Sequence, residues 1–181
     1  MTQRRIYQCD LPYHITFNVL NREWFFDDET KAGILHEIIL NAGDIKNHTI
    51  YQFCIMPDHV HILCKTDDHT NTWFPHRTLE KVRCGDGDTH GTTSFRNEPF
   101  PGCGAALSDF VQSIKGTFSR KIHMGHIWQR RFYDEIIQTE EQLESIIHYI
   151  THNPIEASLP EKWGKHPYQY KNDGLTEQLF L

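Results

Sequence analysis

The sequence predicts an α+β fold, a ferredoxin-like β-α-β-β-α-β sheet with one additional C-terminal helix. Apolar and polar residues alternate over residues 13–19, which is typical of a half-buried strand. Two more strand-like runs, residues 49–55 and 59–65, are joined by the turn-forming residues Pro57 and Asp58. Between the first strand and this pair, residues 27–42 carry apolar side chains at helical spacing.

The second half of the chain supplies the remaining elements. Apolar residues keep helical spacing over residues 106–122, and a strand-like run follows at residues 127–137. A last helix is expected over residues 139–152, with Thr139 at its start and Pro154 ending it. The first helix has a comparable start, since Asp27 or Asp28 can cap it. The tail beyond residue 154 is expected to wrap the surface.

Length and composition indicate one globular domain over residues 1–181. No stretch approaches the roughly 20 apolar residues that a membrane span needs, so we expect no membrane partner. The five cysteines are an odd number and form no CxxC pair. This pattern favours a reducing, cytoplasmic setting over a disulfide framework.

Residues 66–105 interrupt the pattern with a Gly-, Thr- and Asp-rich stretch that has no clear period. Such a long connection without regular structure is unusual inside a compact domain. We therefore expect a flexible insertion here.

The net charge of −6 argues against a protein that coats duplex DNA by charge alone. The basic residues are nevertheless grouped, and a local basic surface can hold a phosphate backbone. The candidate DNA-binding residues are Arg4, Arg5, Lys115, Arg120, Lys121, Arg130 and Arg131. The alternative for the helical members is an ordinary solvated helix face.

His59 and His61 are the sharpest local feature. Alternate residues of a strand point to the same face, so these two imidazoles stand side by side while Val60 and Ile62 face the core. Two imidazoles at this spacing can share one divalent ion. The alternative is two polar residues on a half-exposed strand.

Tyr149 and Asn153 lie four residues apart on the last predicted helix. At about 100° per residue they share one edge of its apolar stripe, where a side chain can reach into a cleft beside the sheet. The alternative is an edge tyrosine that packs its ring, with Asn153 as a helix C-cap.

Together these residues suggest phosphodiester chemistry. A tyrosine hydroxyl can attack a phosphodiester and form a covalent phosphotyrosine, and a metal held by two histidines can polarise the phosphate. Imidazole and amide-oxygen ligands suit Mg²⁺ or Mn²⁺ better than a closed zinc site.

The chain resembles the REP-associated tyrosine transposases, within the superfamily of single-tyrosine HUH transposases. The resemblance covers most of the chain outside residues 66–105, and the combination of its motifs is specific. The matching segments, in family order, are YHITFNVLNREWFF, CIMPDHVHILCK, LSDFVQSIKGTFSRKI, IWQRRFYDEII and LESIIHYITHNPIEASL.

The resemblance implies that His59 and His61 are the metal ligands, Tyr149 the nucleophile and Asn153 a third ligand. It further implies a substrate of single-stranded DNA near a hairpin, typically a repetitive extragenic palindrome (REP). Cleavage would leave a 5′-phosphotyrosine and a free 3′-hydroxyl that can reverse the step. The resemblance leaves open whether the protein is a monomer or a homodimer. The insertion departs from the family, which usually has a short connection there.

Three functions remain open at this point: a metal-dependent transposase, a non-catalytic hairpin-DNA-binding protein derived from one, and an unrelated HxH metallohydrolase of small molecules. Tyr133 and Tyr51 are rival nucleophiles. Trp128 and Phe132 alternate on one strand face, and we interpret them as core residues rather than platforms for base stacking.

Overall fold

The computed structural model describes residues 11–66 and 103–178, and it has the α+β architecture that the sequence predicts. Five strands form one antiparallel sheet in the order β4-β1-β3-β2-β5. The first four follow the ferredoxin-like order, and the fifth extends one edge. The strands are β1 (Pro12–Asn18), β2 (His48–Ile55), β3 (His59–Thr66), β4 (Tyr133–Ile136) and β5 (Gln169–Lys171).

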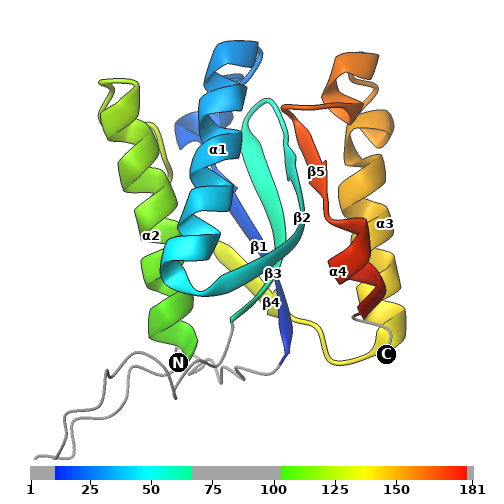
Figure 1. The fold of residues 1–181 in the computed structure, drawn as a ribbon. Coiled ribbons are helices and arrows are strands. Elements are labelled where there is room, and N and C mark those ends of the chain that lie inside the picture. Colours follow the sequence, from blue (N-terminus) through cyan, green and yellow to red (C-terminus); the bar gives the residue numbers. More distant parts are fainter. Residues whose placement is uncertain (1–10, 67–102, 179–181) are drawn as a thin grey trace, which may run out of the picture.

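The helices cover both faces of this sheet (Figure 1). Two helices, α1 (Glu29–Lys46) and α2 (Cys103–Lys121), pack on one face, and α3 (Glu140–Glu156) packs on the other. Short elements complete the chain: the 3-10 helices η1 (Leu20–Arg22) and η2 (Glu161–Gly164), and the helix α4 (Asp173–Gln178). None of the helices in the described ranges has the length and apolar content that a membrane crossing requires.

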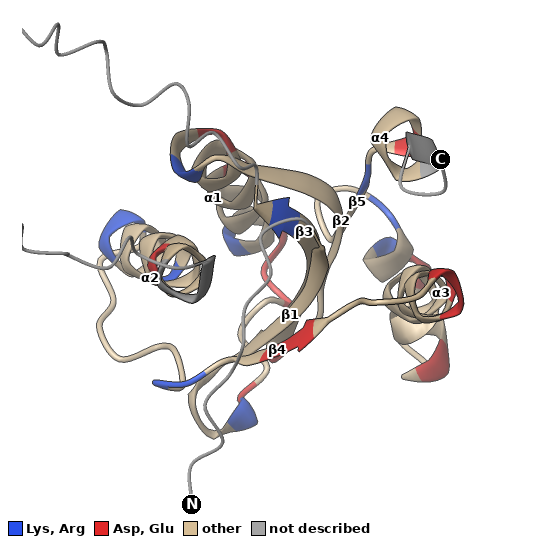
Figure 2. Cartoon of the chain, turned by 90° about the horizontal axis from the view of Figure 1, so that it is seen from below, with Lys and Arg blue, Asp and Glu red and all other residues tan. Residues whose placement is uncertain are grey.

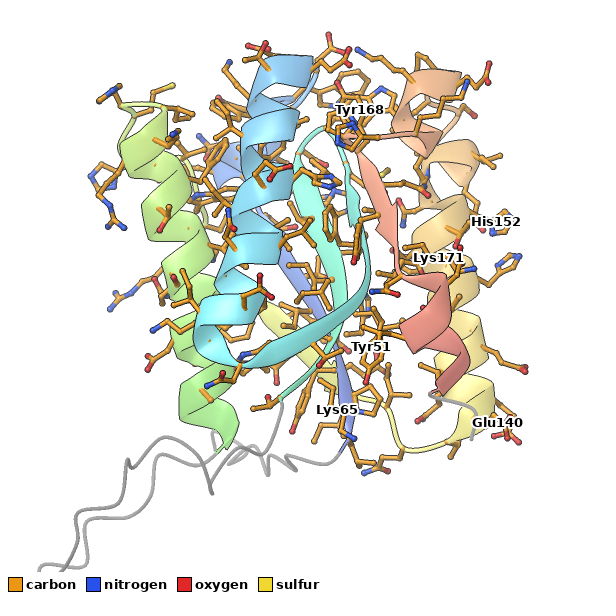
Figure 3. The ribbon with its side chains drawn as sticks, viewed as in Figure 1. Tyr51, Lys65, Glu140, His152, Tyr168 and Lys171 are labelled. Atoms are coloured by element: carbon orange, nitrogen blue, oxygen red, sulfur yellow. The ribbon has the colours of Figure 1, made fainter. Side chains whose placement is uncertain are left out.

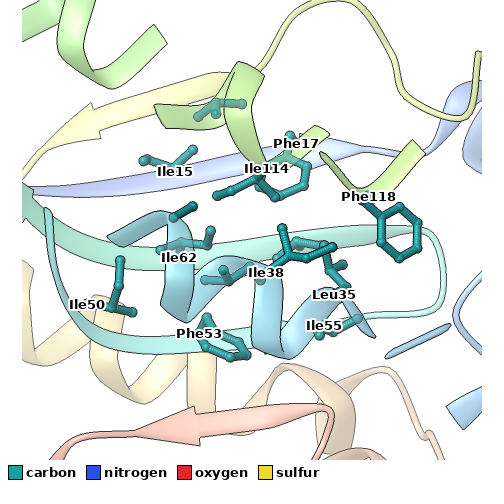
Figure 4. Packing of buried hydrophobic residues seen from close by; sticks show 14 of the residues in the cluster. Ile15, Phe17, Leu35, Ile38, Ile50, Phe53, Ile55, Ile62, Ile114 and Phe118 are labelled. Atoms are coloured by element: carbon teal, nitrogen blue, oxygen red, sulfur yellow. The ribbon is translucent and has the colours of Figure 1, made fainter. Parts of the chain in front are cut away.

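The larger core lies between the sheet and the helices α1 and α2, as Figure 4 shows. Val60 and Ile62 of β3 belong to it and are fully buried. The predicted register of this strand is therefore confirmed, and the alternate residues His59 and His61 face the side of α3.

A smaller apolar cluster lies between the sheet and α3, and it includes Tyr51 of β2 and Ile150 of α3. Figure 3 shows Tyr51 close to the sheet and His152 on the outer side of α3. Two hydrogen bonds fix the helix at Thr151: the Gln52 amide donates to the Thr151 hydroxyl at 2.8 Å, and the Gln169 amide donates to its carbonyl at 2.9 Å. The tyrosine-bearing helix is thus attached to β2 and β5.

Both predicted helix starts are capped by side chains. Asp28, rather than Asp27, caps α1 by accepting from the Thr30 backbone N–H at 3.0 Å. Thr139 caps α3 by accepting from the Gln142 backbone N–H at 3.2 Å.

The helix ends and the last strands differ from the prediction. Pro154 lies inside α3, which continues to Glu156. A proline in the last turn removes only its own bond to the carbonyl of residue 150, so the helix tolerates it there. The strand expected over residues 127–137 is reduced to β4, and the tail contains β5 and α4, which the sequence did not indicate.

Trp128 is one of the residues ahead of the shortened strand, and it forms an isolated bridge to Val19. Its ring meets that of Phe17 edge-on at 5.1 Å, and Phe132 also packs against the larger core. Both aromatics are therefore core residues, as the sequence indicated.

Both ends of the predicted insertion at residues 66–105 lie in regular structure, because Thr66 ends β3 and residue 103 begins α2. Residues 67–102 of the predicted insertion lie outside the described residues. Arg4 and Arg5, near the N-terminus, also lie outside them.

Candidate active site

An open cleft of about 520 Å³ lies on the α3 face of the sheet. Its walls come from β1, η1, β3, β4 and α3. The lining residues are His14, Thr16, Asn18, Arg22, His59, His61, Tyr133, Glu135, Ile146 and Tyr149.

His59 and His61 form the floor of this cleft. Their Nε2 atoms lie 3.0 Å apart, and the two rings meet nearly at right angles. The strand period therefore brings both imidazoles to one point, as the sequence predicted.

The other nitrogen of each ring has its own partner. His59 Nδ1 lies 2.5 Å from Asp58 Oδ1, and since a carboxylate only accepts, this nitrogen is the one that carries the proton. His61 Nδ1 lies 3.0 Å from Thr16 Oγ1 and 3.1 Å from His14 Nε2. A hydroxyl and an imidazole can each donate or accept, so His61 can hold its proton on either nitrogen.

This arrangement fits a divalent metal ion. Asp58 leaves the Nε2 lone pair of His59 free, and with its proton on Nδ1 His61 offers a second lone pair at the same point. Histidines that bind metals commonly donate their other N–H to a carboxylate or another acceptor in this way.

The pKa values of the three histidines favour the neutral form that a metal requires. Burial lowers the pKa of His61 to about 2, and the charges of His59, His14 and Arg22 lower it as well. Burial also lowers the pKa of His14 to about 4. For His59 burial again lowers the pKa, although the hydrogen bond to Asp58 opposes this.

Asn153 lies beside the histidine pair, where its side chain could serve as a third ligand. Its side-chain amide lies 3.4 Å from His61 Nε2, and a flip of the amide turns its oxygen toward the same point. No three His, Cys, Asp or Glu side chains gather as a metal site within residues 11–66 and 103–178. The described chain therefore offers an amide oxygen, rather than another charged or imidazole group, as the third donor.

Tyr149 reaches the same cleft from α3. Its ring stands edge-on to that of His61, with centroids 5.1 Å apart, and 6.0 Å from that of His14. The side chain is 38% exposed, which matches a residue at the edge of the apolar stripe. Of the rival tyrosines, Tyr133 also lines the cleft and is exposed, whereas Tyr51 is buried in the smaller apolar cluster.

None of the five candidate DNA-binding residues that the structure describes lines this cleft. Lys115 requires a correction: it is 5% exposed, and its ammonium donates to the carbonyls of Gln129 and Arg131 at 2.9 and 3.2 Å. Inside the protein it supports the segment that presents Arg130 and Arg131, both of which are exposed.

Arg120 and Lys121 are exposed at the end of α2, on the opposite face of the sheet from α3. Figure 2 shows this division, with basic residues over α2 and acidic residues over β4 and α3.

The residues of the site that were not selected from the sequence include His14, Thr16, Asp58 and Arg22. The alternation of His14, Thr16 and Asn18 along β1 could have shown that they share one face. Asp58, directly before His59, carried no pattern that distinguishes a partner of an imidazole from a turn residue.

Comparison with known proteins supports the resemblance that the motifs suggested. The family profile described as IS200-like transposase matches residues 7–72, which include β1, α1, β2 and β3. Over these residues the chain is similar to the IS200-like transposases.

A Haemophilus influenzae protein named for the REP-associated tyrosine transposases is 24% identical to this chain over 127 residues. The alignment covers 70% of this chain and 61% of that protein, so the chain spans less than two thirds of that relative. A solved structure, of a REP-associated tyrosine transposase bound to a REP hairpin, has a TM-score of 0.63 at 18% identity. The match covers 93% of this chain and 81% of the chain in that structure, and it confirms the fold.

Proposed function

We propose that this protein is a metal-dependent tyrosine transposase that nicks and rejoins single-stranded DNA beside hairpins. The observation that carries the proposal is the meeting of two elements at one cleft: β3 supplies His59 and His61, and α3 supplies Tyr149, with Asn153 of the same helix beside His61.

In the proposed reaction the Tyr149 hydroxyl attacks a backbone phosphorus and loses its proton to water in the open cleft. The bond from phosphorus to the 3′-oxygen breaks, and this oxygen takes up a proton. The products are a 5′-phosphotyrosine and a free 3′-hydroxyl, and the reverse reaction with another 3′-hydroxyl rejoins the strand.

His59, His61 and the Asn153 amide would hold the metal, Mg²⁺ or Mn²⁺. When bound, such an ion polarises a phosphate oxygen and stabilises the charge that develops on it. The chain's own part is to keep both Nε2 lone pairs available, through Asp58 and Thr16.

The hairpin substrate is proposed from the relatives, because a solved structure with this fold holds a REP hairpin. The sequence beside the hairpin that the protein cleaves can be found by selection from a DNA library. A single-stranded library with a fixed stem and randomised flanks is incubated with the protein and Mn²⁺, and covalent adducts are captured and sequenced.

The matched variants are Tyr149→Phe and Tyr133→Phe, because both tyrosines line the cleft and each change removes one hydroxyl. We expect adducts from the wild type and from Tyr133→Phe, and none from Tyr149→Phe. An undiminished adduct with Tyr149→Phe would refute the assignment of the nucleophile. Hairpin binding without any adduct under Mg²⁺ or Mn²⁺ would instead identify a non-catalytic DNA-binding protein.

A further inference from the structure

Arg22 is the one lysine or arginine that lines the cleft, counting the residues that the structure describes. The carboxylate of Glu135 lines the opposite side, on β4. A cleft that accepts the negative backbone of DNA needs a positive group, and the predicted cations on α2 lie on the other face of the sheet.

Two hydrogen bonds fix the guanidinium of Arg22. Its Nε lies 2.7 Å from Asp58 Oδ2, and its Nη1 donates to Asn18 Oδ1 at 2.5 Å. A guanidinium has five N–H donors in a rigid fork. These two contacts therefore leave further N–H groups for a ligand, and the side chain is 49% exposed.

The backbone at Arg22 is unusual. Asn21 and Arg22 have φ values of 56° and 57°, in the left-handed region that few non-glycine residues occupy. The backbone around them is fixed, because Val19 donates to the Asp58 carbonyl at 2.8 Å and Leu20 to that of Ile127 at 2.7 Å. Strained conformations of this kind persist mainly where the surrounding structure imposes them, and they cluster at functional sites.

The positive charge of Arg22 lies next to the histidine pair. Asp58 joins the two, because its Oδ2 accepts from Arg22 Nε and its Oδ1 accepts from His59 Nδ1, and Arg22, His59 and His61 line the same cleft. A phosphate bound between the histidines and Tyr149 would therefore lie within reach of the same charge.

We propose that Arg22 binds a nonbridging oxygen of a backbone phosphate of the strand in the cleft, and that Asn18 and Asp58 hold it in position for this contact. The inference rests on the proposed function, which it extends to a phosphate-binding residue. Arginine suits this role because its planar fork matches the geometry of a phosphate.

Binding to an oligothymidine single strand tests the inference without metal or turnover. The parent protein is Tyr149→Phe, in a buffer with a chelator, and affinity is measured over a range of salt concentrations. We expect Arg22→Gln to weaken binding roughly three- to tenfold and to reduce the salt slope by about 0.7, the contribution of one phosphate on a single strand.

Lys46→Gln is the matched control, because it removes the same charge from an exposed residue of α1, on the far side of the sheet. Lys46→Gln should leave the affinity for the single strand and the salt slope unchanged. Arg22→Lys should restore the salt slope, but only part of the affinity, because an ammonium cannot form the same fork of contacts.

An unchanged affinity and slope in Arg22→Gln would overturn the inference. If the same variant then loses affinity for Mn²⁺, Arg22 acts only by holding Asp58. The two proposals can fail separately. If the wild type forms adducts but Arg22→Gln has the same salt slope as its parent, only the role of Arg22 is refuted. If the Tyr149→Phe parent binds no single strand, both the role of Arg22 and the proposed function are refuted.

Discussion

His59 and His61 bring their Nε2 atoms to within 3.0 Å of each other, and burial lowers the pKa of both rings. Without a metal, a proton must lie between the two nitrogens, and His61 must then accept at Nδ1 from Thr16 or His14. When His61 moves that proton to Nδ1, two lone pairs face one point. The pair could therefore change from a hydrogen bond to the proposed metal-binding arrangement without breaking its outer contacts.

Asp58→Asn should lower the affinity for Mn²⁺ by roughly 10- to 100-fold, the usual effect of losing an outer partner of a metal-binding histidine. The carboxylate fixes the tautomer of His59 through Nδ1 and raises the basicity of the ring, and an amide does this less well. Isothermal titration calorimetry measures the affinity. Asp44→Asn, at an exposed position of α1, removes the same charge and should have no effect. Equal affinities for the two variants would contradict the role of Asp58.

Asn153→Ala should weaken Mn²⁺ binding, whereas Asn153→Asp should preserve or strengthen it, because Mn²⁺ prefers oxygen ligands and a carboxylate is the stronger one. The same calorimetric titration ranks the variants, and thermal unfolding checks that α3 remains folded. If all three proteins bind Mn²⁺ equally, the amide is not a ligand.

The sequence alone predicts the histidine pair well, because a strand has a period of two and Val60 and Ile62 fix which face is buried. It predicts Tyr149 less well. Helix geometry places this residue at the edge of an apolar stripe, but only the packing of α3 on β2 decides that the edge faces the histidines.

Lys115 shows why the basic residues were harder to predict. Its place in a basic segment indicated a surface contact with DNA, yet the residue is buried because its ammonium satisfies two carbonyls. Those carbonyls lie 14 and 16 residues further along the chain, beyond the end of α2, so the periodicity of the helix could not reveal them. The same holds for β5, a strand of only Gln169–Lys171 that exists because it pairs with β2.

Lys115 also predicts how stability depends on pH. Burial lowers its pKa to about 8 in the folded chain, below the ordinary value of 10.5. Between these two pH values the unfolded chain binds the additional proton, so this group raises the free energy of unfolding as the pH increases from 8 to 10.5. Urea unfolding of the wild type and of Lys115→Met over this range measures the effect.

The difference in unfolding free energy between the two proteins should shift in favour of the wild type as the pH increases. Lys46→Met controls for the loss of one lysine, since Lys46 is exposed at the end of α1. A difference that stays constant from neutral pH to pH 10.5 would show that burial does not disfavour the charged form of Lys115.

The two glycines of α1 should respond to alanine with opposite signs. A Cβ at Gly33 would meet no atom within 4 Å, so Gly33→Ala should stabilise the protein by about 0.5–1 kcal/mol through the lower backbone entropy of the unfolded chain. A Cβ at Gly43 would lie 2.9 Å from the His48 carbonyl oxygen and 2.9 Å from Ile50 Cγ1. Gly43→Ala should therefore destabilise by about 1–3 kcal/mol, because the start of β2 must move away from the helix.

Urea denaturation of the two single variants measures both changes, and each serves as the control for the other because both lie inside α1. Together the two variants test how closely the start of β2 packs against the last turns of α1. The sequence placed the end of this helix near Gly43, but the helix continues to Lys46 and the glycine allows the next strand to pass close to it. If Gly43→Ala were as stabilising as Gly33→Ala, the close contact of Gly43 with His48 and Ile50 would be wrong, and with it the register in which β2 leaves the helix.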